Sequence, residues 1–505
     1  MTRTSYAPST EPGVSRRRRW AGLAVLSASL LLVVMDMTIL NVALPAISAD
    51  LRPGAVELLW MVDVYALVLS GLLVTVSALG DRWGRKKMLL TGFALFGLAS
   101  TAVLWADSPG EVIAVRAMLG VGGAMIMPST LSMIRTLFTE PRERATALGV
   151  WAAMAALGGA LGPILGGLLL EHFSWHAAFL VNVPVMTAAI VAGLFLLPES
   201  RNPRPGRWDV FATALSITGM VALVYSIKQF GKEGPADIGP WVTLGLAVVT
   251  LTWFVRRCLK RSDPLLEVRL FRSRPFTAGT IAALSTSIAM AAMMLLMAQW
   301  MQLVGGYSPL ETGVRLLPTA LGALVLSPLA PSLAVRLGTR PVLAGGLVVS
   351  GLGFGVLYAA PATYPWIAVS LLLIGLGMGS LAIASAVIMA GAPPEKAGSA
   401  AAIEETSYEL GGVLGVAVLG SVAAAVYREA LPATAGDAAR ESLAAAIEVA
   451  RQAGATGRHL AQQAKAAFTL SLEMTGLAGG VLMLAAALAV WWLVPRDLDV
   501  TAGHN

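Results

Sequence analysis

Charged residues and cysteines are both scarce in this chain of 505 residues. Only 13% of the residues are Asp, Glu, Lys or Arg, whereas 56% are hydrophobic. Soluble globular domains carry about 25% charged residues. The single cysteine, Cys258, excludes a framework of disulfide bonds and a cysteine-based metal site. The composition therefore excludes water-soluble and disordered proteins and predicts a polytopic membrane protein.

Signatures of ATP use and of catalysis are also missing. No stretch matches the phosphate-binding pattern GxxxxGK[ST], so ATP is not expected to supply energy. The apolar segments carry no pairing of nucleophile and base and no cluster of metal ligands, so an enzyme is not expected. We predict neither a cofactor nor a metal site.

Long apolar runs, by contrast, fill most of the chain, and a membrane helix needs about 20 mostly apolar residues. The first run is too long for a cleavable signal peptide, so none is expected. We count fourteen predicted spans, at 20–47, 57–79, 88–106, 111–134, 145–170, 177–197, 209–229, 239–255, 275–303, 310–335, 341–360, 365–390, 399–427 and 469–494.

The positive charges indicate how these spans are oriented. Most of the 36 Lys and Arg residues lie in the two terminal tails and in the loops on the same side, including RRRR at 16–19. Such loops face the cytoplasm. The net charge of +7 is therefore a topology signal, and we predict two cytoplasmic termini and no nucleic-acid partner.

Two loops in corresponding places of the chain resemble each other. SALGDRWGRKK at 77–87 follows the second span, and SLAVRLGTRP at 332–341 follows the tenth. Repeated halves are typical of secondary transporters. We predict these parts: a basic tail 1–19, a six-helix bundle 20–197, a two-helix insertion with linkers 198–274, a second six-helix bundle 275–494 with a helical hairpin loop 428–468, and a tail 495–505.

Five motifs, in order, resemble those of the fourteen-helix drug:proton antiporter family of the major facilitator superfamily. They are MDMTILNVALPAI (35–47), GDRWGRKK (80–87), RAMLGVGGAMIMP (116–128), GPILGG (162–167) and WHAAFLVNVP (175–184). The resemblance implies an all-α membrane protein with the major facilitator fold: two six-helix bundles and two extra central helices. It also implies proton-coupled antiport by alternating access in the cell membrane.

Ionisable residues within membrane spans are functional candidates. Asp36 lies in the first span, Asp63 in the second and Arg116 in the fourth. Asp63 and Arg116 lie at similar depths, so an ion pair between them is allowed. We predict that both acids bind protons or cations and that Arg116 relays the coupling. The alternative is that Asp36 and the pair only stabilise helix packing.

Three further acids, Glu404, Glu405 and Glu409, lie in the thirteenth span. Glu405 and Glu409 are spaced i, i+4 and share a helix face. For Glu404 above all, the alternative is a helix N-terminus, where the macrodipole favours negative charge. We predict that all three bind protons or cations, and the resemblance implies drug binding on this face.

Two motifs predict moving parts. In the loop after the second span, Asp81, Arg82, Arg85 and Lys86 are predicted to lock one conformation through ionic contacts. In the fifth span, the resemblance implies an antiporter hinge at Gly162, Pro163, Gly166 and Gly167. Plain positive-inside anchoring and plain close packing are the respective alternatives. The methionine-rich run 289–302 is a candidate for lining a drug cavity or for packing.

The function predicted from these features is proton-coupled multidrug efflux of lipophilic or cationic compounds, such as dyes, quaternary ammonium antiseptics and antibiotics. The alternative is export of one metabolite or of a self-made antibiotic. The expected partners are cationic or lipophilic small molecules, protons and the lipid bilayer. We expect a monomer driven by the proton gradient.

Overall fold

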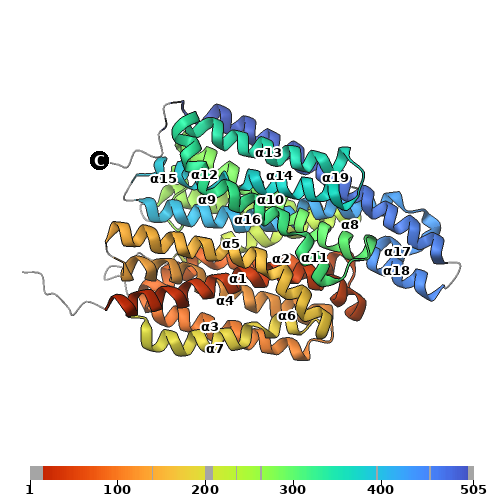
Figure 1. The fold of residues 1–505 in the computed structure, drawn as a ribbon, viewed down its shortest axis with the longest axis horizontal. Helices are drawn as coiled ribbons and strands as arrows, with labels where there is room; N and C mark the ends of the chain where they lie inside the picture. The colour runs from red at the N-terminus through yellow and green to blue at the C-terminus, as the bar shows by residue number, and fades with distance from the viewer. Residues whose placement is uncertain are drawn as a thin grey trace, which may run out of the picture.

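The computed structural model describes residues 15–498, apart from 139, 200–208, 235, 262–263, 394–395, 454–456 and 497. Within these residues, thirteen helical segments are long and apolar enough to cross a membrane. A further helix of 32 residues, α5 (Pro141–His172), packs along α1 (Arg16–Leu51). The protein is therefore an all-α bundle of long helices (Figure 1).

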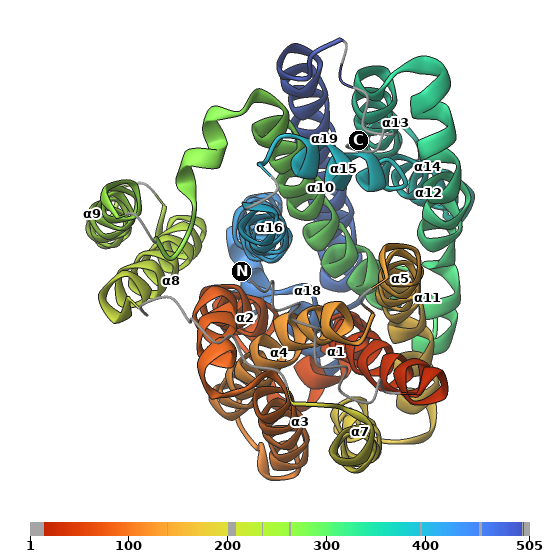
Figure 2. The same ribbon diagram turned by 90° about the vertical axis from the view of Figure 1, so that its left-hand side faces the viewer.

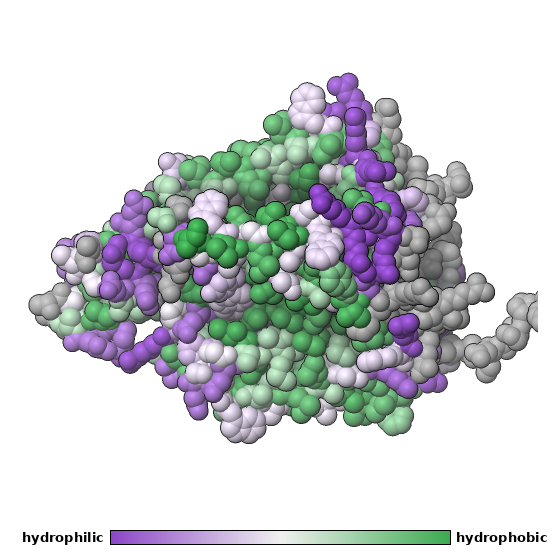
Figure 3. Space-filling model, turned by 180° about the vertical axis from the view of Figure 1, so that it is seen from behind, coloured by the Kyte–Doolittle hydropathy of each residue, from purple (hydrophilic) through white to green (hydrophobic). Residues whose placement is uncertain are grey.

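The surface of the bundle confirms a membrane environment. Large apolar side chains such as Phe195, Leu324 and Trp492 are at least 70% exposed. Figure 3 shows hydrophobic side chains across the middle of the molecule and hydrophilic ones gathered toward its ends. Exposed apolar area on this scale requires lipid rather than water as the surrounding solvent.

The first hydrophobic core is built mainly by residues 23–197, with Leu295 and Val416 added from the C-terminal half. Buried side chains such as Leu26, Phe93 and Phe96 join the helices of this part into one cluster. Its helices besides α1 and α5 are α2 (Ala55–Trp83), α3 (Arg85–Ala102), η1 (Val103–Trp105), α4 (Pro109–Leu137), α6 (Ala177–Leu180) and α7 (Asn182–Leu196).

A second core joins helices from the C-terminal half. They are α10 (Arg274–Gln299), the π-turn η3 (Trp300–Val304), α12 (Leu317–Leu337), α13 (Thr339–Ala359), α14 (Tyr364–Met378), α15 (Leu381–Ala390), α16 (Ala397–Ala430) and α19 (Gly457–Leu493). The short helix α11 (Pro309–Arg315), between η3 and α12, packs against α5 instead. Met293, Met297 and Met301 are buried in this core. For these three methionines, packing within the bundle is the role that the structure supports.

Between the two parts in sequence, α8 (Val210–Glu233) and α9 (Gly239–Lys260) form an antiparallel pair, followed by η2 (Val268–Arg272). Figure 2 shows this pair at the edge of the molecule, beside α2 and α16. A hydrogen bond of 3.1 Å between the hydroxyls of Thr75 and Thr213 attaches α8 to α2. The two extra helices are therefore peripheral in space, although they are central in sequence.

Both ends of the described chain lie at one end of the molecule, which we call the terminal side; we call the opposite end the far side (Figure 1). At the far side lie η5 (Ala433–Ala435), α17 (Asp437–Glu441) and α18 (Leu443–Gln452). Helix α18 packs against α19 and contacts α1. Its Glu448 lies 3.9 Å from Arg52 at the end of α1.

The two halves of the chain contact each other closely toward the far side. The Gln302 amide donates a 3.0 Å hydrogen bond to the Val42 carbonyl, and the Ser308 hydroxyl bonds the Glu171 carboxylate at 2.7 Å. A Cβ added at Gly167 would lie 2.5 Å from Leu310 Cα. Because glycine has no Cβ, α5 approaches the backbone of α11 at this point. The far side is therefore closed.

Candidate functional site

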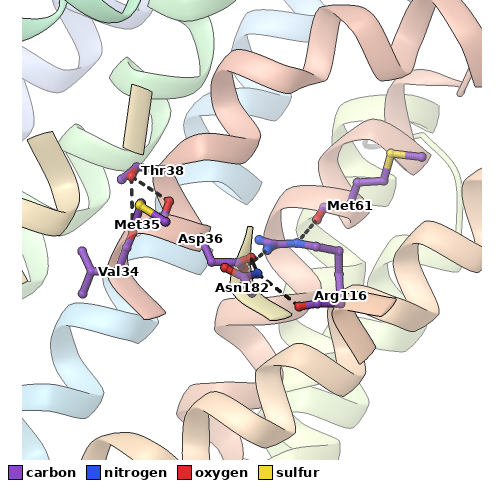
Figure 4. Close-up of polar contacts among 8 residues, drawn as sticks. Val34, Met35, Asp36, Thr38, Met61, Arg116 and Asn182 are labelled. Carbon is purple, nitrogen blue, oxygen red and sulfur yellow. Dashed lines mark hydrogen bonds and ion pairs between the residues drawn. The ribbon is translucent and has the colours of Figure 1, made fainter. Parts of the chain in front are cut away.

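A buried ion pair links α1 and α4 inside the first core (Figure 4). The guanidinium Nη1 of Arg116 donates a hydrogen bond of 2.8 Å to Oδ2 of Asp36. Each residue is 1% exposed. Both were predicted from the sequence as functional residues, but this pairing was not: the sequence placed Arg116 opposite Asp63.

The second oxygen of Asp36 is held from another direction. The Asn182 amide donates a 2.6 Å hydrogen bond to Oδ1 of Asp36 and a 3.1 Å hydrogen bond to the Ser100 hydroxyl. Asn182 is the first residue of α7, and Ser100 lies near the end of α3. Sequence reasoning missed both residues. The available signal was that Asn182 is polar within the apolar motif WHAAFLVNVP.

The arginine is enclosed by groups from α2. Its Nε donates a 3.2 Å hydrogen bond to the Met61 carbonyl, and its guanidinium carbon lies 4.5 Å from the centre of the Tyr65 ring. Asp63, which is 1% exposed, lies between these two residues in the sequence of α2. The predicted pair between Asp63 and Arg116 stays a prediction, while the structure adds the pair with Asp36.

The hydrogen bonds of Asp36, Arg116 and Asn182 connect five helices: α1, α2, α3, α4 and α7. Removing one partner of a buried ion pair typically costs about 3–5 kcal/mol, because the other charge stays buried without compensation. A proton on Asp36 would have the same electrostatic effect on Arg116. The ionisation state of Asp36 therefore affects the contacts that join these helices.

A second set of acids lies on α16, which packs against α2, α8, α10 and α19. Figure 2 shows α16 near the centre of the molecule. Glu404 is 9% exposed, and its Oε2 accepts a 3.2 Å hydrogen bond from the Ser385 hydroxyl of α15. Glu405 is half-buried, and the side chain of Glu409 lies outside the described part.

The position of Glu404 within α16 tests whether this residue interacts with the dipole of the helix N-terminus. Helix α16 begins at Ala397, so Glu404 lies about two turns into the helix. The macrodipole effect falls off within the first turn. The alternative explanation for Glu404 is therefore wrong, and this residue is instead a buried carboxylate bonded to a neighbouring helix.

The predicted lock residues lie at the terminal side. Arg82 is exposed and Arg85 is buried, while the side chain of Asp81 lies outside the described part. The ammonium of Lys86 donates a 2.7 Å hydrogen bond to the Leu194 carbonyl in the last turn of α7. The structure thus ties the beginning of α3 to the end of α7 through Lys86.

An acid that the sequence analysis did not single out also lies there. The carboxylate of Glu199 accepts a 3.2 Å hydrogen bond from the Lys86 backbone N–H, in the first turn of α3. Gly84 precedes this helix with φ 113°, and an added Cβ would overlap the Glu199 carboxylate. The positive φ favours glycine at this position, and the absence of a Cβ leaves room for the Glu199 carboxylate. Negative charge at a helix N-terminus is favourable.

The glycines of GPILGG lie against α1 and α11. A Cβ at Gly162 would overlap the Thr38 hydroxyl and lie 2.9 Å from the Met35 carbonyl, one residue before Asp36. The carbonyl of Pro163 lies against Gly313 of α11, where an added Cβ would overlap it. The motif therefore connects the surroundings of Asp36 with the closed far side. Within the described residues, no group of three or more His, Cys, Asp or Glu could hold a metal.

The arrangement of long helices is that of the major facilitator fold. It superposes on crystal structures of a bacterial homologue of the human lysosomal transporter Spinster. For the inward-facing, unoccupied form the TM-score is 0.68, at 17% identity, over 95% of this chain and 97% of that one. The inward-facing, occupied form gives a TM-score of 0.67.

The family follows from sequence comparison. Residues 26–416 match the model of the Major Facilitator Superfamily, so the chain belongs to this family. It is similar to the multidrug efflux pump LfrA of Mycolicibacterium smegmatis, with 39% identity over 94% of this chain and 96% of that protein. Methyl viologen resistance protein SmvA of Salmonella typhimurium is 36% identical over 95% of this chain and 99% of that protein. The chain is thus a multi-pass transporter of the cell membrane rather than an enzyme.

Proposed function

We propose that this protein is a proton-coupled multidrug efflux antiporter that exports lipophilic cations by alternating access. The observation that carries the proposal is the fully buried pair of Asp36 and Arg116, held by Met61 and Asn182. A carboxylate in such a place can take up a proton, and its ionisation state governs how the helices around it pack.

The coupling step is electrostatic. Protonation of Asp36 removes the charge that holds Arg116 on α1, and Arg116 can then turn to another acid, with Asp63 nearby on α2. The resulting shift of α1 and α4 acts on α5, whose Gly162 and Gly166 lie against α1 and whose Pro163 and Gly167 lie against α11. These four residues serve as the hinge. Asp81, Arg82, Arg85 and Lys86 hold the opposite end in one of the two conformations.

Substrate binding falls to the acids of α16. Glu404, Glu405 and Glu409 attract cations to a helix that lies between the two cores. Under the positive-inside rule the terminal side faces the cytoplasm, so the closed far side faces outward. We propose that the protein works as a monomer, with the two six-helix bundles at 20–197 and 275–494 as the moving bodies.

Reconstitution into liposomes tests the proposal. The pure protein should move a dye cation faster when the pH gradient is imposed, and Asp36→Asn should abolish that difference. Equal rates with and without the gradient would refute proton coupling.

The second candidate is export of one compound, and one comparison favours it. The tetracenomycin C resistance and export protein of Streptomyces glaucescens is 32% identical over 94% of this chain. Competition of the dye by chemically unrelated cations separates the two functions. Competition by several of them supports multidrug export, and competition by none supports a single substrate.

A further inference from the structure

The outward face of α9 carries a hollow of about 790 Å³ that the proposed transport cycle does not use. Its lining residues follow one stripe along the helix, from Val248 to Arg261. The upper part of the stripe is apolar and exposed: Val248, Val249 and Trp253 are all more than half exposed. The lower part, toward the end of α9, is basic.

The dimensions of the stripe match one membrane leaflet. Thirteen residue steps of a helix span about 20 Å. Half of the hydrocarbon core is about 15 Å thick, and the headgroup layer lies beyond it. The apolar part of the stripe therefore lies at the depth of the acyl chains, and the basic part lies at the depth of the headgroups on the terminal side.

The cations at the basic end are of two kinds. Arg257 donates hydrogen bonds of 2.7 and 3.0 Å to Asp209, and Arg261 donates one of 2.6 Å to the same buried carboxylate. Arg256 and Lys260 are exposed, and the structure gives them no ionic partner within the part of the chain that it describes. Two cations therefore remain available to an anion.

Between the apolar and the basic part of the stripe, side chains of α9 pack against an aromatic ring of α8. The Trp253 ring packs edge-on against Phe211 of α8 at 5.0 Å, and the Arg257 guanidinium lies 5.2 Å from the same Phe211 ring. Tryptophan is enriched at the membrane interface, where one end of the ring is apolar and the other polar. Trp253 thus marks the boundary between the acyl-chain and headgroup levels. Figure 3 shows hydrophilic side chains gathered toward the terminal side of the apolar surface.

We propose that this stripe binds one anionic phospholipid in the leaflet on the terminal side. Its phosphate bonds Arg256 and Lys260, and an acyl chain lies along Val248, Val249 and Trp253. Charge-assisted bonds from Arg and Lys to phosphate are strong, and basic sites of this kind recognise anionic headgroups. The lipid would fasten the peripheral pair α8–α9 to the membrane. This site is independent of which substrate the protein exports.

Native mass spectrometry tests the proposal with phosphatidylglycerol, phosphatidylcholine and inorganic phosphate as probes. In the double variant Arg256→Gln/Lys260→Gln, the affinity for phosphatidylglycerol should fall about tenfold or more. The charge-preserving variant Arg256→Lys/Lys260→Arg should keep it. A control, Lys87→Gln/Arg336→Gln, removes two exposed cations elsewhere on the terminal side and should change the affinity less than twofold.

Three results would overturn the site. An equal loss in the control variant would show that general surface charge holds the lipid. Phosphatidylcholine binding as tightly as phosphatidylglycerol would exclude recognition of an anionic headgroup. Inorganic phosphate that binds alone with the affinity of the lipid would show a site for free anions. None of these results would affect the proton-coupling test, which measures dye transport.

Discussion

Arg116 on α4 pairs with Asp36 on α1 at 2.8 Å, and each residue is 1% exposed. An arginine keeps its charge in proteins, so the carboxylate is the member of this pair that can change its ionisation state. Asn182 holds the other carboxylate oxygen at 2.6 Å. The pair therefore contains one titratable carboxylate, which its hydrogen bonds hold in a fixed position between α1, α4 and α7.

Neutralising this acid should impair both folding and transport. In Asp36→Asn, Arg116 stays charged and buried, so the free energy of unfolding should fall by about 3–5 kcal/mol. The double variant Asp36→Asn/Arg116→Gln removes both charges and should recover most of the stability without recovering proton-driven dye transport. Thermal unfolding and liposome transport measure the two effects.

Asp50→Asn is the matched control for this experiment. Asp50 lies in the last turn of α1, is exposed, and accepts a 2.8 Å hydrogen bond from Trp175. It should retain coupled transport. If the double variant transported normally, Asp36 would be a structural residue only.

The acids of α16 should distinguish charged from neutral substrates. Glu404→Gln and Glu405→Gln should each weaken binding of a dye cation about tenfold. Each variant removes one negative charge, and the attraction of a buried or half-buried charge for a cation is stronger than in bulk water. A neutral substrate of similar shape should be affected much less. Equilibrium binding in detergent measures both, with Ser385→Ala as a variant that removes only the hydrogen bond to Glu404.

The spacing of these acids supplies a further comparison within the same experiment. Glu405 and Glu409 share a helix face, so a double-mutant cycle should show stronger coupling between them than between either and Glu404. Equal weakening of charged and neutral substrates in every variant would mean that the acids maintain structure rather than attract charge.

The contact of α5 with α11 should be sensitive to a single methyl group. In Gly167→Ala, the new Cβ would lie 2.5 Å from Leu310 Cα and 2.6 Å from Leu310 N. Backbone atoms cannot move aside as a flexible side chain can, so the far side should fail to close and transport should fall at least tenfold. Labelling of a cysteine placed at Ser308, in a Cys258→Ser background, should become faster.

Gly159 provides the control in the same helix. A Cβ there would come no closer than 4.0 Å to the Val34 side chain. Gly159→Ala should therefore leave both transport and labelling unchanged. A closed, active Gly167→Ala protein would show that this contact does not need to be so close.

Asp209 should make stability depend on pH. Hydrogen bonds from Arg257, together with its N-cap bond from the Ala212 N–H and the charge of Arg261, hold the pKa of Asp209 below its ordinary value. A lowered pKa in the folded state means that the stabilisation is present above the unfolded-state pKa, near 4, and is lost as the pH falls through the folded-state pKa. At pH 7, Asp209→Asn should therefore lower the melting temperature.

The difference in melting temperature between wild type and Asp209→Asn should shrink as the pH falls below about 4. Asparagine also caps helices well, so the variant isolates the charge from the cap. A difference that stayed constant between pH 7 and pH 3 would show that the ion pairs with Arg257 and Arg261 do not contribute.

The sequence by itself determined the class of this protein and most of its helices. Apolar runs of about 20 residues admit one structure in lipid, because every backbone polar group must be bonded within its own segment. Thirteen of the fourteen predicted spans correspond to helices long and apolar enough to cross a membrane, with α6–α7, α11–α12 and α14–α15 each forming one span. The fourteenth, 145–170, corresponds to α5. The motifs likewise identified Asp36, Arg116 and Glu404 as residues that need an explanation.

Only the tertiary structure decided which of these residues meet. Depth along a helix is readable from sequence, but the rotation of one helix against another is set by side-chain packing between segments far apart in the chain. For this reason the sequence suggested Asp63 as a partner of Arg116 but not Asp36, which the structure joins to Arg116 across 80 residues, together with Asn182 from 146 residues away. Packing of this kind also places the two insertion helices at the edge of the bundle, where one face of α9 is exposed to lipid.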